Sequence, residues 1–90
     1  MWKIAFSHHA RKALSKLEPK LRATIEDRIA NIKEWLNDEA PLHANVIRLT
    51  GKWASFCRLR VRDMRVLFSI DTENRMVRIH AIGKRDEIYR

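Results

Sequence analysis

The stretch CRLRVRDMRVLFSI, residues 57–70, alternates apolar and polar residues almost without interruption. Alternation with a period of two is typical of strands that bury one face. The pair Arg62-Asp63 breaks the pattern, and so short a break predicts a hairpin between strands at 55–62 and 64–70. Four of the polar positions within eight residues are arginines, which solubility alone does not require. The sequence therefore predicts a strand pair with an arginine-rich wet face.

Two helices are expected before this strand pair. Ser7 suits a helix N-cap, and Pro19 ends that first helix and suits the first turn of the next. Apolar residues then recur every three or four positions from Leu21 to Leu36. This spacing predicts one long amphipathic helix, which the turn-rich segment 37–41 ends. Trp35 follows the apolar stripe closely and is expected to pack.

Three further strands complete the predicted fold. They are expected at residues 2–6, 46–50 and 75–82, the last stopped by Gly83, with turns at 51–53 and 71–74. The chain is thus predicted to be one α+β domain over residues 1–90, in the order β-α-α-β-β-β-β. Two helices would cover one face of a small, twisted, antiparallel-rich sheet and leave the other face in water.

Alternation also assigns the strand side chains to the two faces. The face toward the helices is expected to carry Cys57, Leu59, Val61, Val66, Phe68, Ile70, Val77, Ile79 and Ala81. The open face is expected to carry Arg58, Arg60, Arg62, Arg65, Leu67, Ser69, Arg78 and His80. A shift of one residue would bury the arginines, so the register is strongly constrained.

Charge is the most informative global property. The chain has 19 Lys and Arg against 11 Asp and Glu, a net charge of +8. Residues 1–47 hold 8 basic and 6 acidic residues, whereas residues 48–90 hold 11 basic and 5 acidic. The second half is also richer in arginine, whose planar fork binds phosphate in a bidentate way. A polyanionic partner is therefore predicted, with its contacts in the second half.

Other classes of protein are disfavoured by the sequence. No apolar run approaches the roughly 18 residues of a membrane span, and the start of the chain lacks a secretory pattern. The single cysteine, Cys57, allows no internal disulfide. The pair His8-His9 lacks further ligands at metal-binding spacing. We therefore expect a cytoplasmic protein without a membrane partner, a metal or a cofactor.

Two motifs carry a resemblance to a known family. LRVRDMRVLFSID (59–71) resembles a strand–turn–strand motif, and IGKRDEIYR (82–90) is similar to an ending of Gly, a basic pair, acidic residues and Tyr. Over nearly the whole chain, the sequence resembles the RelE/ParE superfamily of bacterial and archaeal type II toxin–antitoxin pairs, with RelE-like members most similar. The resemblance implies a cognate antitoxin, often acidic and helical, and a hetero-oligomeric complex with it.

The RelE-like resemblance implies a metal-free endoribonuclease that cleaves messenger RNA at the ribosome. In that chemistry the ribose 2′-OH attacks the adjacent phosphate, and basic residues stabilise the charge that develops. By resemblance the catalytic positions are Arg58, Arg65, Arg85 and Tyr89. The further residues expected to bind RNA are Lys52, Arg60, Arg62, Arg78, His80 and Lys84.

One departure from the family pattern affects the mechanism. Phe56 stands where RNA-cleaving members have a lysine, and arginine is a poor general acid or base because its pKa is above about 12. Lys52 and His80 are the alternatives for proton transfer. Two other functions stay open: a ParE-like inhibitor of DNA gyrase, and a non-catalytic module that binds nucleic acid or an antitoxin.

Overall fold

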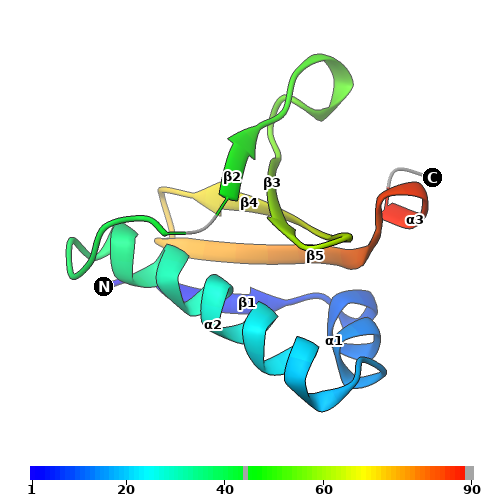
Figure 1. The fold of residues 1–90 in the computed structure, drawn as a ribbon. Helices are drawn as coiled ribbons and strands as arrows, with labels where there is room; N and C mark the ends of the chain where they lie inside the picture. The colour runs from blue at the N-terminus through cyan, green and yellow to red at the C-terminus, as the bar shows by residue number, and fades with distance from the viewer. Residues whose placement is uncertain (44, 89–90) are drawn as a thin grey trace.

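The chain folds into a five-stranded sheet with two helices on one face, in a computed structural model that describes residues 1–43 and 45–88 (Figure 1). This arrangement confirms the predicted α+β class and element order. Two short helices are present that the sequence did not predict. The strands are β1 (Lys3–Phe6), β2 (Asn45–Arg48), β3 (Cys57–Val61), β4 (Met64–Asp71) and β5 (Met76–Lys84). The helices are α1 (His8–Ser15), α2 (Pro19–Leu36), the 3-10 helix η1 (Gly51–Trp53) and α3 (Arg85–Ile88).

The sheet is mixed, with the strand order β1-β5-β4-β3-β2. The first strand pairs in parallel with β5, and every other neighbouring pair is antiparallel. The two long helices form the connection between β1 and β2, which are the two edge strands of the sheet. Within the described residues, no helix is both long and apolar enough to cross a membrane.

Ser7 joins the first helix to the sheet. Its Oγ accepts a hydrogen bond from the N–H of Ala10 at 3.0 Å, as an N-cap does, and donates to the carbonyl of His80 at 2.8 Å. Its backbone N–H donates to the carbonyl of Ile79 at 2.9 Å. The predicted cap is confirmed, and it also fixes the start of α1 against β5.

The main core lies between the helices and the sheet, as the two sequence periods predict. Fully buried isoleucines of α2, at positions 25, 29 and 32, meet the apolar positions of the strands. The strand residues in this core are Leu59, Val61, Met64, Val66, Phe68, Val77, Ile79 and Ile82, with Cys57 and Ile70 packed against it. Trp35 differs from the expectation, because 40% of it is exposed at the end of α2.

An irregularity in β5 overturns the predicted position of Ala81. Leu67 pairs with Ala81, whereas the next residue, Phe68, pairs with Ile79, so His80 is an extra residue in β5. Such a β-bulge shifts the alternation by one residue. Ala81 therefore packs with Leu67 on the face away from the main core, contrary to the prediction.

The prediction that Gly83 stops the last strand is wrong, because Gly83 lies within β5. A Cβ atom at this position would lie 3.1 Å from Cγ2 of Ile88 and 3.3 Å from Cβ of Glu87. The glycine thus lets α3 fold back closely over β5. As a result the second face of the sheet is partly covered, by α3 and by the segment around η1, rather than left fully in water.

We expect Ser7→Ala to lower the free energy of unfolding by about 1–2 kcal/mol, because it removes both a helix cap and a bond to β5. Urea denaturation measures this change. Ser15→Ala is the matched control, since the Ser15 hydroxyl makes one exposed bond to the carbonyl of Lys12 within the same helix. Equal losses for the two variants would contradict the role given to Ser7.

Candidate functional site

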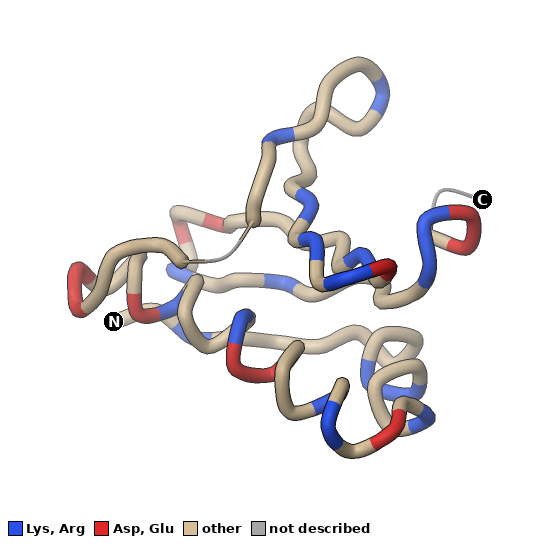
Figure 2. The backbone as a smooth tube through the Cα atoms, viewed as in Figure 1, with Lys and Arg blue, Asp and Glu red and all other residues tan. Residues whose placement is uncertain are grey.

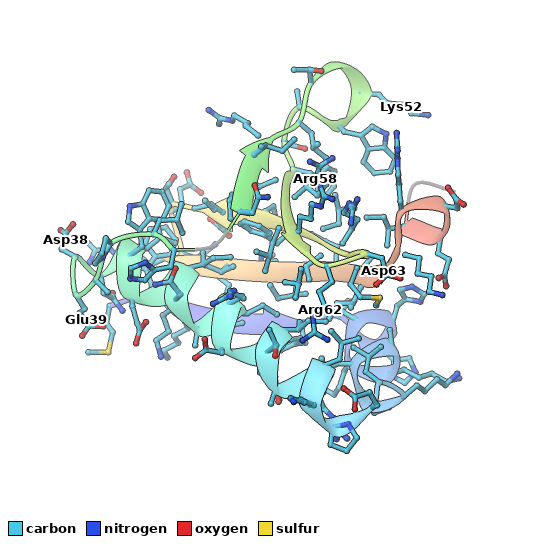
Figure 3. All side chains as sticks on the ribbon, viewed as in Figure 1. Asp38, Glu39, Lys52, Arg58, Arg62 and Asp63 are labelled. Carbon is cyan, nitrogen blue, oxygen red and sulfur yellow. The ribbon has the colours of Figure 1, made fainter. Side chains whose placement is uncertain are left out.

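Three of the predicted arginines lie together on the second face of the sheet. Arg58 and Arg60 alternate along β3, and Arg65 of β4 stands directly opposite Arg60 in the register. Like charges at directly opposed positions destabilise a strand pair. Figure 3 shows Arg58 between β3 and the η1 segment, with Lys52 extending from η1 toward the side where α3 lies. We call Arg58, Arg60 and Arg65, together with Arg62 in the turn between β3 and β4, the arginine face.

Arg65 is more buried than the alternation predicts. It is 9% exposed, and its Nη1 donates to the carbonyls of Arg62 at 3.2 Å and Met64 at 3.1 Å. The reason is tertiary: α3 packs against β4 and β5 and covers this end of the face. The guanidinium of Arg65 is thereby fixed to the backbone of the β3–β4 turn, which orients that turn.

Arg58, Arg60 and Arg62 have no carboxylate partners in the described part of the chain. The ion pairs there join Arg28 to Asp27 and Arg78 to Asp71, so none involves Arg58, Arg60 or Arg62. The buried Nε of Arg58 also has no hydrogen-bond acceptor among those residues. A buried charged donor without an acceptor is costly, so an anion bound here would gain strong, charge-assisted hydrogen bonds.

An apolar cluster lies beside the arginines. It has a buried centre and a partly buried rim, formed by Leu67, Ala81 and Ile88 and by Leu49, Trp53 and Phe56. Trp53 and Phe56 meet edge to face with centroids 5.6 Å apart, and Lys52 Nζ lies 5.8 Å from the centroid of Trp53. Cationic and aromatic side chains in this combination are typical of surfaces that bind single-stranded nucleic acid.

His80 lies in the bulge of β5 and is held on two sides. Its Nε2 is 2.7 Å from Oγ of Ser69, and its ring meets Phe56 edge to face with centroids 5.0 Å apart. Burial lowers the pKa of His80 below its usual value, and the positive charge of Arg78 lowers it further. The imidazole is therefore neutral at pH 7 and half-buried, in a hydrogen-bonded position.

The other residues predicted to form the site, as far as the structure describes them, do not lie on the arginine face. Arg78 lies toward the opposite end of β5 and is bound to Asp71 at 3.2 Å, so it does not join the arginine face. Lys84 ends β5 and lines a cavity on the α1 side of the sheet. Arg85 begins α3 and is exposed. Tyr89 lies outside the described residues.

A family model described as the ParE toxin of the type II toxin–antitoxin system parDE matches residues 4–89. The chain belongs to this family. It is a type II toxin of the RelE/ParE superfamily, as the motifs predicted. Comparison with curated proteins found no significant match.

Solved structures share the fold of this ParE-family toxin. The isolated RelE toxin of E. coli is 22% identical, with a TM-score of 0.73, and the match covers 99% of this chain and 92% of that one. The toxin–antitoxin complex RelBE2 of Mycobacterium tuberculosis gives 24% identity and a TM-score of 0.72, over 93% and 98% of the two chains. The RelB–RelE complex of Methanococcus jannaschii gives 19% identity and a TM-score of 0.69, covering 93% of each chain.

Sequence reasoning missed the apolar cluster of this toxin's second face. Leu49, Trp53 and Phe56 are spaced four and three residues apart, which is an apolar stripe of helical period. The turn predicted at 51–53 masks this signal, because a turn that connects two strands leaves no place for a helical stripe. The stripe is what brings Phe56 over His80 and turns the η1 segment toward α3.

We expect the stability of this toxin to fall as the pH drops below about 6.5, the ordinary pKa of histidine. The pKa of His80 is lowered in the folded state, so the unfolded state binds more protons in the window between the two pKa values. Urea denaturation at a series of pH values from 7.5 to 5.5 measures the effect. In His80→Gln the dependence in this window should be weaker, and an unchanged dependence would contradict the assignment.

Proposed function

We propose that this toxin is a metal-free endoribonuclease that cleaves messenger RNA bound to the ribosome and so inhibits translation and growth. The observation that carries the proposal is the arginine face: Arg58 and Arg60 have no carboxylate partner among the described residues, although they crowd against Arg65. A phosphate backbone supplies the negative charge that such a surface lacks. The neighbouring aromatic cluster offers an edge on which bases can stack.

The proposed chemistry follows from the charges of the site. The ribose 2′-OH attacks the adjacent phosphorus, the bond to the 5′-oxygen breaks, and negative charge accumulates on the phosphate oxygens. Arg58 and Arg60 stabilise this charge from the sheet, and Arg85 does so from α3. Arg65 contributes its charge from below the surface, since its guanidinium is bound to backbone carbonyls.

Proton transfer in this proposal needs a group other than arginine. Lys52 extends from η1 toward the side of α3 and is a candidate for the acid or base (Figure 3). His80 is neutral at pH 7, but its Nε2 is already engaged by Ser69. Tyr89, which by resemblance to the family would either stack on a base or help to move a proton, is the third candidate.

The proposed partner of the toxin is a cognate antitoxin. RelB antitoxins accompany the similar toxins of Mycobacterium tuberculosis and Methanococcus jannaschii in their solved complexes. A helical, acidic antitoxin segment would complement the net charge of +8. The resulting complex would be a hetero-oligomer that blocks toxicity in the cytoplasm.

We expect induction of the toxin in cells to produce new 5′ ends within messenger RNAs. Arg58→Ala should reduce cleavage on the order of 100-fold, because a preorganised cation is lost from the developing charge, while the circular dichroism spectrum stays unchanged. Arg28→Ala is the control, since its ion pair with Asp27 is exposed and lies on α2. Growth arrest with intact messenger RNAs would overturn the ribonuclease proposal.

The alternative is inhibition of DNA gyrase. Phe56 occupies the place of a family lysine and packs on His80, which favours a face that binds without cleaving. The ParE description of the matching family is consistent with this alternative. A supercoiling assay with purified gyrase and toxin separates the two, because a ribonuclease leaves supercoiling unaffected.

A further inference from the structure

A second basic surface lies outside the arginine face. A cavity of about 590 Å³ opens between α1, α3 and the neighbouring ends of β4 and β5. Three exposed lysines line it together with His9: Lys12 of α1, Lys16 at the C-cap of α1, and Lys84 of β5. Residues four positions apart on a helix share one face, so Lys12 and Lys16 present their ammonium groups to the same opening.

Among the described lining residues, the carboxylate of Glu87 offsets only part of the charge of the three lysines. Glu87 Oε1 accepts a hydrogen bond from the backbone N–H of Lys84 at 3.2 Å, so its carboxylate is engaged at the start of α3. Across residues 1–43 and 45–88, no carboxylate forms an ion pair with Lys12, Lys16 or Lys84. The cavity therefore has a positive rim that attracts an anion.

The floor of the cavity is apolar. Leu17, Ile82 and Ile88 contribute to it, and Ile82 and Ile88 are 3% and 7% exposed. A volume of this size falls within the range of small-ligand pockets, roughly 300–1,000 Å³. An apolar floor under a cationic rim fits a nucleotide, whose base is flat and poorly hydrated and whose phosphate is anionic.

The cavity lies next to the arginine face, at the same end of the sheet. Arg65 pairs with Gly83, and the adjacent residue pair, Met64 with Lys84, belongs to the cavity lining. The same short helix separates the two surfaces, because Ile88 of α3 lines the cavity and also packs with Leu67 on the second face. Figure 2 shows Lys and Arg gathered along β3, at its turn with β4, and on α1 at this end of the molecule.

We propose that this cavity binds a nucleotide of the same single-stranded RNA that the arginine face holds, with Lys12 and Lys16 on its phosphate. The RNA passes around the end of the sheet beside α3 and enters the cavity. The inference rests on the proposed function for the choice of RNA as ligand, and it does not require cleavage. It adds α1, a helix remote from the reacting phosphate, to the substrate-binding surface.

The test is the salt dependence of RNA binding. The probe is a fluorescent single-stranded RNA of about 12 nucleotides, within the range of known single-strand sites, with 2′-O-methyl groups that prevent 2′-OH attack. For the double variant Lys12→Gln/Lys16→Gln, fluorescence anisotropy should show a slope of log K against log salt that is smaller by about 0.7, the value for the one phosphate contact that the two lysines share.

The control is Lys3→Gln/Lys20→Gln, which removes the same charge from two exposed lysines that do not line the cavity. Its slope should stay close to that of the unmodified toxin. An unchanged slope for the cavity variant, or equal losses in both double variants, would overturn the proposal. Binding of an oligoglutamate peptide that only the cavity variant loses, with RNA binding unchanged, would assign the cavity to an acidic protein and also overturn it.

The outcome is separable from that of the ribonuclease proposal. If the unmodified toxin binds the probe with the expected slope difference but leaves messenger RNA intact in cells, the cavity assignment stands and the ribonuclease proposal fails. If messenger RNA is cleaved but the cavity variant and the unmodified toxin have equal slopes, the ribonuclease proposal stands and the cavity assignment fails.

Discussion

The antiparallel register between β3 and β4 is the constraint on which the rest of this structure depends. It sets Leu59 against Val66 in the main core and Arg60 against Arg65 on the other face. A shift by one residue would exchange these faces and bury guanidinium groups among the isoleucines of α2. The repulsion between the two arginines therefore costs less free energy than burying their guanidinium groups in the apolar core would.

The second face is organised by two local features of β5. The bulge at His80 moves Ala81 out of the main core, and Gly83 leaves the space that α3 occupies. Together they bring Ile88 down onto Leu67 and close one side of the arginine face. The face becomes a surface with a charged centre, an aromatic edge and a helical boundary.

Stability and binding compete on this face. The arginines add repulsion, and the buried Nε of Arg58 has no acceptor within residues 1–43 and 45–88, while the core on the other side of the sheet supplies the apolar burial that offsets these costs. Sites that lose some stability to concentrated charge are expected where a ligand of opposite charge restores it. Lys12, Lys16 and Lys84 continue this concentration of positive charge around the end of the sheet.

The sequence alone determined the two longer helices, the five strands and the two faces of β3 and β4, because apolar periodicity, the Ser7 cap and short turns are local signals. It also determined the family, through the motifs at 59–71 and 82–90. Tertiary structure decided the position of Ala81, the burial of Arg65 and the apolar cluster around Phe56. These depend on a bulge and on a helix folding back over β5, and contacts between distant segments leave no periodic trace in the chain.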